Sequence, residues 1–135
     1  MKRKFLFTGL IAASMFFQSA VADDTPLAEQ MEHLNDAYKA MRREEDPAKG
    51  SALAREAQDA MIKAIAEVPE MVANMPDGSE KEKSVALYRK MMGNLIVTLA
   101  DMELAFHDGD MAKVAEMVDA LRASKKEGHN KFMEE

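Results

Sequence analysis

The sequence predicts an all-α protein, an antiparallel up-down-up-down four-helix bundle. Apolar residues recur at steps of three and four in four successive segments, which is the spacing of one buried helix face. The connections between these segments are short, and short connections favour antiparallel neighbours. Glycine is scarce, at 6 residues in 135, and no segment shows the alternating pattern of a strand. These observations together favour a helical bundle over a fold that contains a sheet.

The first helix is expected to begin at Thr25-Pro26, where a capping side chain precedes a proline at the first helical position. The second helix is expected to start between Pro47 and Ser51 and to end or kink at Pro69. Residues 69–78 then form a connection with room for one helical turn. The predicted buried face of the first helix is Leu27, Met31, Leu34, Tyr38 and Met41. The predicted face of the second helix is Leu53, Ala57, Met61, Ala64 and Val68.

The third helix has a clear start signal, because Ser79 to Glu82 fits a capping box. Gly109 is expected in a left-handed turn after this helix, and Asp110 is expected to cap the fourth helix, which runs from about Met111 to Phe132. The predicted face of the third helix is Val85, Tyr88, Met92, Leu95, Leu99, Met102 and Phe106. The face of the fourth is Val114, Val118, Leu121, Gly128 and Phe132, interrupted only by Lys125.

Residues 1–22 have the pattern of a secretory signal peptide. Basic residues at positions 2–4 precede an apolar run from Phe5 to Phe17, and Ala20-Val-Ala22 matches a cleavage site. The apolar run is shorter than the roughly 20 residues that a membrane-spanning helix needs. We therefore expect an exported protein, cleaved near Ala22, with a single four-helix-bundle domain over residues 23–135.

Charge and cysteine content exclude several classes of function. Removing residues 1–22 leaves 15 basic and 24 acidic residues, a net charge of −9, which argues against nucleic acid or an anionic membrane as partners. The same charge favours a partner with a basic surface. The chain has no cysteine, which excludes thiol catalysis, thiolate-bound iron–sulfur clusters and covalent c-type haem attachment.

Met31 and His129 are candidate ligands for a haem iron. In the predicted topology the start of the first helix and the end of the fourth lie at the same end of the bundle. Met31 is about five residues along its helix, or roughly 8 Å, so the two side chains are expected at similar depth. A thioether and an imidazole facing each other can be the axial pair of a six-coordinate haem. Met31 also fits as a core residue and His129 as a packed helix end, and spacing alone leaves both interpretations open.

The two ends of the chain resemble the cytochrome b562 family. The motifs are Met31-Glu-His-Leu-Asn-Asp36 in the first helix and Leu121-Arg-x-x-Lys125-x-x-x-His129-x-Lys131-Phe132 in the last. The resemblance extends over residues 24–132, and members of this family are up-down-up-down bundles, so it implies the same topology. It also implies one non-covalent b-type haem (heme b) per chain, with Met31 and His129 as iron ligands. The implied function is electron transfer in the periplasm, not catalysis.

The resemblance further implies which other side chains contact the haem. Lys125 stands where the family tends to have an arginine, which keeps a cation but not a bidentate one. Tyr88 and Met92 stand where the family has phenylalanines, and both can cover a porphyrin face. Leu34, on the same face as Met31, completes the expected set. The expected partners are the haem and redox proteins with basic docking surfaces.

A haem-free binding or stress protein in the same compartment is the alternative function. Copper handling belongs to this alternative, because thioethers suit Cu(I) and the chain has 13 methionines, 11 of them after residue 22. Met71, Met75 and Met133 are expected at the surface, although the methionines form no M-x-M cluster. His33 is expected to point away from the face that carries Met31, and His107 is expected at a helix end. No pattern of a catalytic serine or of paired inward carboxylates is present in the sequence, so we do not expect an enzyme.

Overall fold

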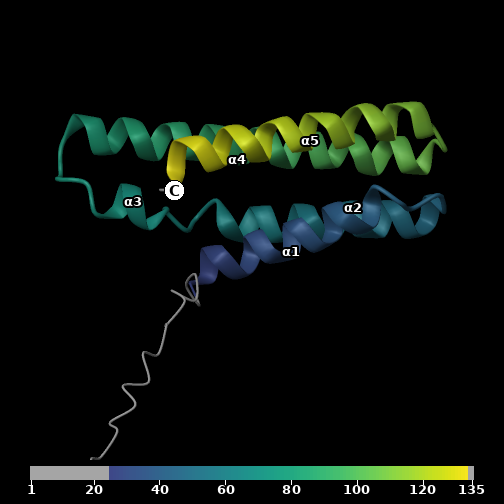
Figure 1. The fold of residues 1–135 in the computed structure, drawn as a ribbon, viewed down its shortest axis with the longest axis horizontal. Coiled ribbons are helices and arrows are strands. Elements are labelled where there is room, and N and C mark those ends of the chain that lie inside the picture. The colour runs from purple at the N-terminus through teal and green to yellow at the C-terminus, as the bar shows by residue number, and fades with distance from the viewer. Residues whose placement is uncertain (1–24, 134–135) are drawn as a thin grey trace, which may run out of the picture.

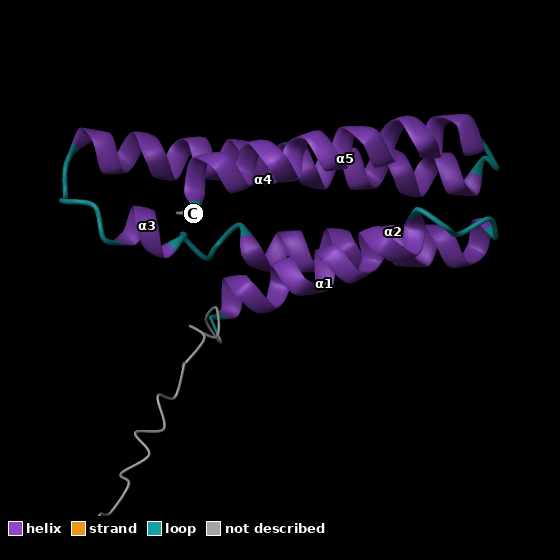
Figure 2. Ribbon diagram, in the orientation of Figure 1, coloured by secondary structure: helices purple, strands orange, loops and turns teal. Residues whose placement is uncertain are grey.

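The computed structural model describes residues 25–133, and these are all-helical (Figure 1; Figure 2). The helices are α1 (Pro26–Met41), α2 (Pro47–Ala64), α3 (Glu70–Ala73), α4 (Ser79–His107) and α5 (Met111–Phe132). The predicted all-α class and the four predicted long helices are confirmed. The predicted signal peptide lies outside the described residues. Among those residues, no helix combines the length and the apolar character that crossing a membrane requires.

Capping side chains set the starts of α1, α2 and α5. Thr25, Asp46 and Asp110 each accept a hydrogen bond from the backbone N–H three residues later, at 3.0 to 3.1 Å. Each contact satisfies a backbone donor that the first turn of a helix leaves without a partner. Gly109 has a φ of 66°, the left-handed conformation that the sequence predicts between α4 and α5. These starts agree with the sequence analysis.

The predicted capping box at the start of α4 is wrong. Ser79 is the first helical residue and not the cap, and no side chain caps this end. Gly78 occupies the cap position with a φ of 148°, which residues with a side chain rarely adopt. The backbone N–H of Glu82 donates to the Gly78 carbonyl at 3.1 Å. Glycine geometry therefore sets this helix start.

The buried face of α2 is wider than the prediction. Leu53 and Val68 are only half-buried, whereas Ala54 and Ala60 join the predicted residues in the core. The reason is that α2 packs against both α1 and α4, so small side chains on two sides of the helix allow close approach. The helix ends at Ala64, before Pro69, and the single turn of α3 follows in the connection.

Close packing between the long helices follows the order α1–α2–α4–α5, whereas α1 and α5 make few close backbone approaches. In Figure 1 the last turns of α5 (yellow) lie near the start of α1 along the long axis. The largest fully buried side chains come from all four long helices: Leu34, Met41, Met61, Leu99, Met102, Phe106 and Leu121. Three pairs of long helices are thus closely packed: α1 with α2, α2 with α4, and α4 with α5. The fourth pair, α1 and α5, is connected mainly by side chains.

A substitution at Gly50 tests a close approach between α2 and α4. A Cβ atom at Gly50 would overlap the ring of Phe106, which is fully buried. We expect Gly50→Ala to lower the free energy of unfolding by about 1–3 kcal/mol, as overpacked cores do. Urea denaturation measures the change. Gly93→Ala is the matched control, because no atom lies within 4 Å of a Cβ there. The control should be neutral or stabilising, and equal effects at both sites would contradict the Phe106 explanation.

Candidate functional site between α1 and α5

Two side-chain contacts join α1 to α5. The Arg122 Nε donates a hydrogen bond to the Tyr38 hydroxyl at 3.2 Å, and the Lys125 ammonium donates to Asn35 Oδ1 at 2.7 Å. The same ammonium lies 4.7 Å from the centroid of the Tyr38 ring, which is a cation–π contact. Both hydrogen bonds are partly buried. We call the Tyr38–Arg122 and Asn35–Lys125 contacts the α1–α5 rungs.

The rungs define how residues of α1 and α5 are paired. From the first rung to the second, the pairing moves three residues toward the start of α1 and three toward the end of α5. A further step of four residues in each direction reaches Met31 and His129. Steps of three and four keep residues on one helix face. Met31 and His129 are therefore the next pair after the two rungs: each lies four residues beyond the second rung, Met31 on the same face of α1 and His129 on the same face of α5.

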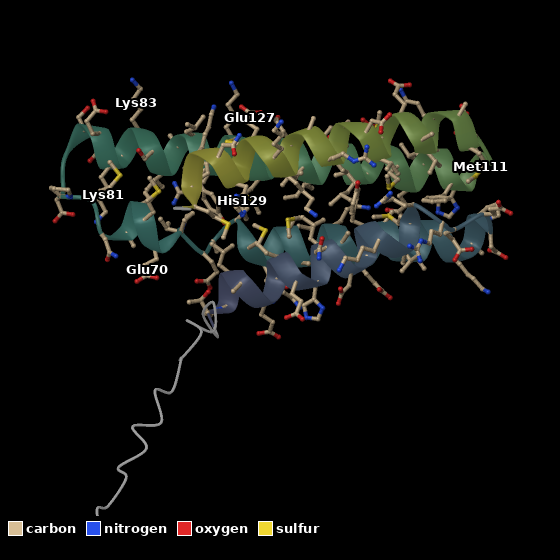
Figure 3. The ribbon with its side chains drawn as sticks, in the orientation of Figure 1. Glu70, Lys81, Lys83, Met111, Glu127 and His129 are labelled. Atoms are coloured by element: carbon tan, nitrogen blue, oxygen red, sulfur yellow. The ribbon has the colours of Figure 1, made fainter. Side chains whose placement is uncertain are left out.

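Met31 and His129 differ in their surroundings. Met31 is half-buried and packs against the core, whereas His129 is exposed in the last turns of α5. Figure 3 shows His129 near the end of α5, on the side that faces the α1–α2 pair. Among residues 25–133, the His129 imidazole has no hydrogen bond or ion pair. Its ring nitrogens are thus not engaged within the described part of the chain.

Met31 and Phe132 pack against a core of apolar side chains. The predicted haem contacts belong to this core and are all buried, at 2 or 3% exposure: Leu34, Tyr88 and Met92. The Tyr88 ring meets Phe132 edge to face, with centroids 5.6 Å apart. The Tyr88 hydroxyl donates to the Ala64 carbonyl, at the end of α2, at 2.6 Å. Burial, and secondarily the charge of Glu67, raises the pKa of Tyr88 to about 12, so this hydroxyl remains a donor at neutral pH.

Removing the Tyr88 hydroxyl tests the hydrogen bond from this side chain to the Ala64 carbonyl. We expect Tyr88→Phe to lower the free energy of unfolding by about 1–2 kcal/mol at pH 7, because the Ala64 carbonyl loses its hydroxyl donor. The folded pKa of about 12 lies above the unfolded value of about 10. The wild-type advantage should therefore be complete below pH 10 and disappear as the pH rises to 12. Urea denaturation from pH 7 to 12 measures it, and a pH-independent difference would contradict the assignment.

The polar contacts between these helices were not predicted from the sequence. Lys125 was expected to contact only the haem, whereas its ammonium contacts Asn35 and Tyr38 on α1. Asn35 and Arg122 were not expected to contribute. A signal for Asn35 was present, because it lies four residues after Met31 and three before Tyr38, on the apolar face of α1. A polar side chain on such a face needs a hydrogen-bonding partner.

The other metal-ligand candidates take no part in the α1–α5 rungs. His33 and His107 are exposed, and the Nε2 atoms are 3.8 and 3.9 Å from a glutamate carboxylate four residues earlier. Within residues 25–133, no group of three or more His, Asp or Glu side chains could hold a metal ion. Of the methionines that the sequence suggests at the surface, Met71 and Met133 are exposed and Met75 is half-buried.

The residues at the level of Met31 and His129 fit a non-covalent haem. The thioether and the imidazole are donors that haem iron takes, and the neighbouring interior is apolar. One surface hollow lies between α1 and α2 and another at the start of α4, and neither is lined by these two residues.

The profile of the family described as Cytochrome b562 matches residues 26–133, a range that includes all five helices and both Met31 and His129. The chain has no significant match among curated proteins, and it has none among solved structures. The family match covers well over half of the chain. The chain therefore belongs to the cytochrome b562 family, whose members are haem-binding electron carriers.

Proposed function

We propose that the chain binds one non-covalent b-type haem between α1 and α5, with Met31 and His129 as axial ligands, and carries electrons in the periplasm. The observation that best supports this proposal is the pairing of α1 with α5, in which Met31 and His129 each lie four residues beyond the Asn35–Lys125 rung. The proposed architecture is an antiparallel up-down-up-down bundle over residues 23–135. In this topology the start of α1 and the end of α5 lie at the same end.

The proposed roles of the side chains follow from their chemistry. The His129 imidazole is the stronger donor, and the Met31 thioether is a soft ligand that favours ferrous iron and so raises the reduction potential. The buried side chains beside them keep water from the porphyrin: Leu34, Tyr88 and Met92. A haem bound in this way supplies reversible one-electron exchange between Fe(III) and Fe(II). With Met31 and His129 both holding the iron, no iron position would remain for a substrate.

The proposed location and partners follow from the sequence. Removal of residues 1–22 on export leaves a net charge of −9, which favours encounter with redox proteins that present basic docking surfaces. Nucleic acid and anionic membranes are not proposed as partners. Intact-mass measurement of the native protein should give an N-terminus at or near residue 23. Retention of Met1 on a cytosolic protein would overturn the proposed location.

A visible spectrum tests the haem proposal directly. Native protein, freshly purified and reduced with dithionite, should show the sharp α and Soret bands of a low-spin haem at one haem per chain. If haem is lost during purification, stoichiometric haemin should restore the same bands. A chain that neither carries nor takes up haem would refute the proposal and favour the haem-free binding or stress protein.

A further inference from the structure

The α1–α5 rungs are contacts among the chain's own side chains, so their formation does not depend on a haem. The Lys125 contact is the stronger of the two by its geometry. A hydrogen bond from an ammonium at 2.7 Å is charge-assisted, and the cation also lies over the Tyr38 ring. The Arg122 guanidinium makes a longer bond of 3.2 Å, and its side chain is 58% exposed, so solvent screens it more.

Contacts on both sides of His129 fix the last turns of α5. Lys125, one turn before His129, reaches α1 through Asn35. Phe132, three residues after His129, packs against Tyr88 of α4, whose hydroxyl is bonded to the end of α2. The segment that carries His129 therefore contacts α1 and α4 directly, and the Tyr88 side chain that it contacts is in turn bonded to the end of α2. A rotation or axial shift of α5 would break the Lys125–Asn35 and Phe132–Tyr88 contacts together.

We infer that Lys125 is a positioning residue: its contacts with Asn35 and Tyr38 set the register of α5 on α1, so that Met31 and His129 oppose each other before a haem enters. The consequence for haem binding depends on the proposed function, whereas the register belongs to the haem-free chain. A preset register means that haem binding need not order the two helices, and this strengthens affinity. If only a fraction of molecules held the register, the apparent affinity would fall by that fraction.

Distances between spin labels in the haem-free mature chain test the register. The chain has no cysteine, so Glu32→Cys and Ala123→Cys provide two unique labelling positions. Both residues are exposed, on α1 and α5, and neither takes part in a rung. We expect one narrow distance distribution in the parent and a broader or displaced one after Lys125→Met, which keeps the apolar stem but removes the ammonium. Lys125→Arg, which keeps a cationic donor, should restore the narrow distribution.

Lys126→Met is the matched control, since it makes the same change at the next residue of α5, which is exposed. It should leave the distribution as in the parent. Haemin titration of the same variants should show binding about tenfold weaker for Lys125→Met, with Lys126→Met unchanged and Lys125→Arg close to the parent. Asn35→Ala removes the hydrogen bond but leaves the ammonium over the Tyr38 ring, so it should weaken haem binding less than Lys125→Met does. The double variant should be no weaker than Lys125→Met alone, because Lys125→Met already removes the hydrogen bond to Asn35.

The outcomes separate this inference from the proposed function. A broad distribution in the parent, or an unchanged one in Lys125→Met, would overturn the positioning role. Weaker haem binding with an unchanged distance would also overturn it, because Lys125 would then act on the haem directly. If the parent takes up no haem, the proposed function fails, while the spin-label distances still decide whether Lys125 sets the register.

Discussion

Replacing His129 by alanine is expected to abolish the low-spin haem spectrum. The imidazole is the stronger of the two proposed donors, and no other histidine in residues 25–133 follows the α1–α5 rungs. We expect haem affinity to fall on the order of a hundredfold, equivalent to about 3 kcal/mol. Haemin titration followed by absorbance measures both the affinity and the spin state. Because His129 is exposed, its removal should leave the helical content of the haem-free chain unchanged.

The companion variant Met31→Ala should keep the haem but change its coordination. Loss of the thioether should give five-coordinate or water-ligated haem with a lower reduction potential, because the thioether favours ferrous iron. His33→Ala and Met75→Ala are the controls, and both should retain the parent spectrum. If His33→Ala destroys the low-spin spectrum while His129→Ala does not, the ligand assignment is wrong. In that case the end of α5 is only a packed helix terminus.

The helices were predictable because their signals are local. Thr25 and Asp110 cap the helices that the sequence assigns to them, and the regular apolar steps of α4 match its buried residues closely. The error at the start of α4 arises because two adjacent residues can each serve as the cap. Ser79 fits a capping box, but Gly78 directly before it can adopt a φ of 148° and takes the cap position. Sequence spacing cannot decide between two adjacent caps.

The wider buried face of α2 was not predictable because it depends on packing against two helices. Leu53 is the larger apolar residue, but it is only half-buried, whereas Ala54 is completely buried in a helix that packs against both α1 and α4. A periodic pattern gives the buried face of a helix with one neighbour. A helix with two neighbouring helices has a wider buried face, and small residues lie where the helices are closest. The tight contact of Gly50 with Phe106 has the same origin.

The candidate site was predictable in part. Met31 and His129 follow from residue type, position along the predicted helices and the family motif, and the pairing of α1 with α5 supports them. The partners of Lys125 did not follow, since side chains 90 residues apart in sequence form that contact. A polar residue on an apolar face shows that a partner is needed, as at Asn35. It does not show which residue that partner is.

Haem binding is expected to raise the stability of the chain strongly. A ligand that binds the folded state and not the unfolded chain stabilises by mass action, by about 4 kcal/mol when free ligand is a thousandfold above the dissociation constant. A change of 1 kcal/mol shifts the melting temperature of a domain of this size by about 4–8 °C, so the expected increase is on the order of 20 °C. Thermal unfolding followed by circular dichroism, with and without stoichiometric haemin, measures this increase.

The control for this stabilisation is the His129→Ala chain, which should gain little from haemin. The haem-free parent should still be helical, because its core and the caps at Thr25, Asp46 and Asp110 are formed by the chain alone. A gain that persists in His129→Ala would indicate non-specific binding of haemin to apolar surface. Equal melting temperatures of the parent with and without haemin would rule out a tight haem site, because a ligand with a strong preference for the folded state must shift the unfolding equilibrium.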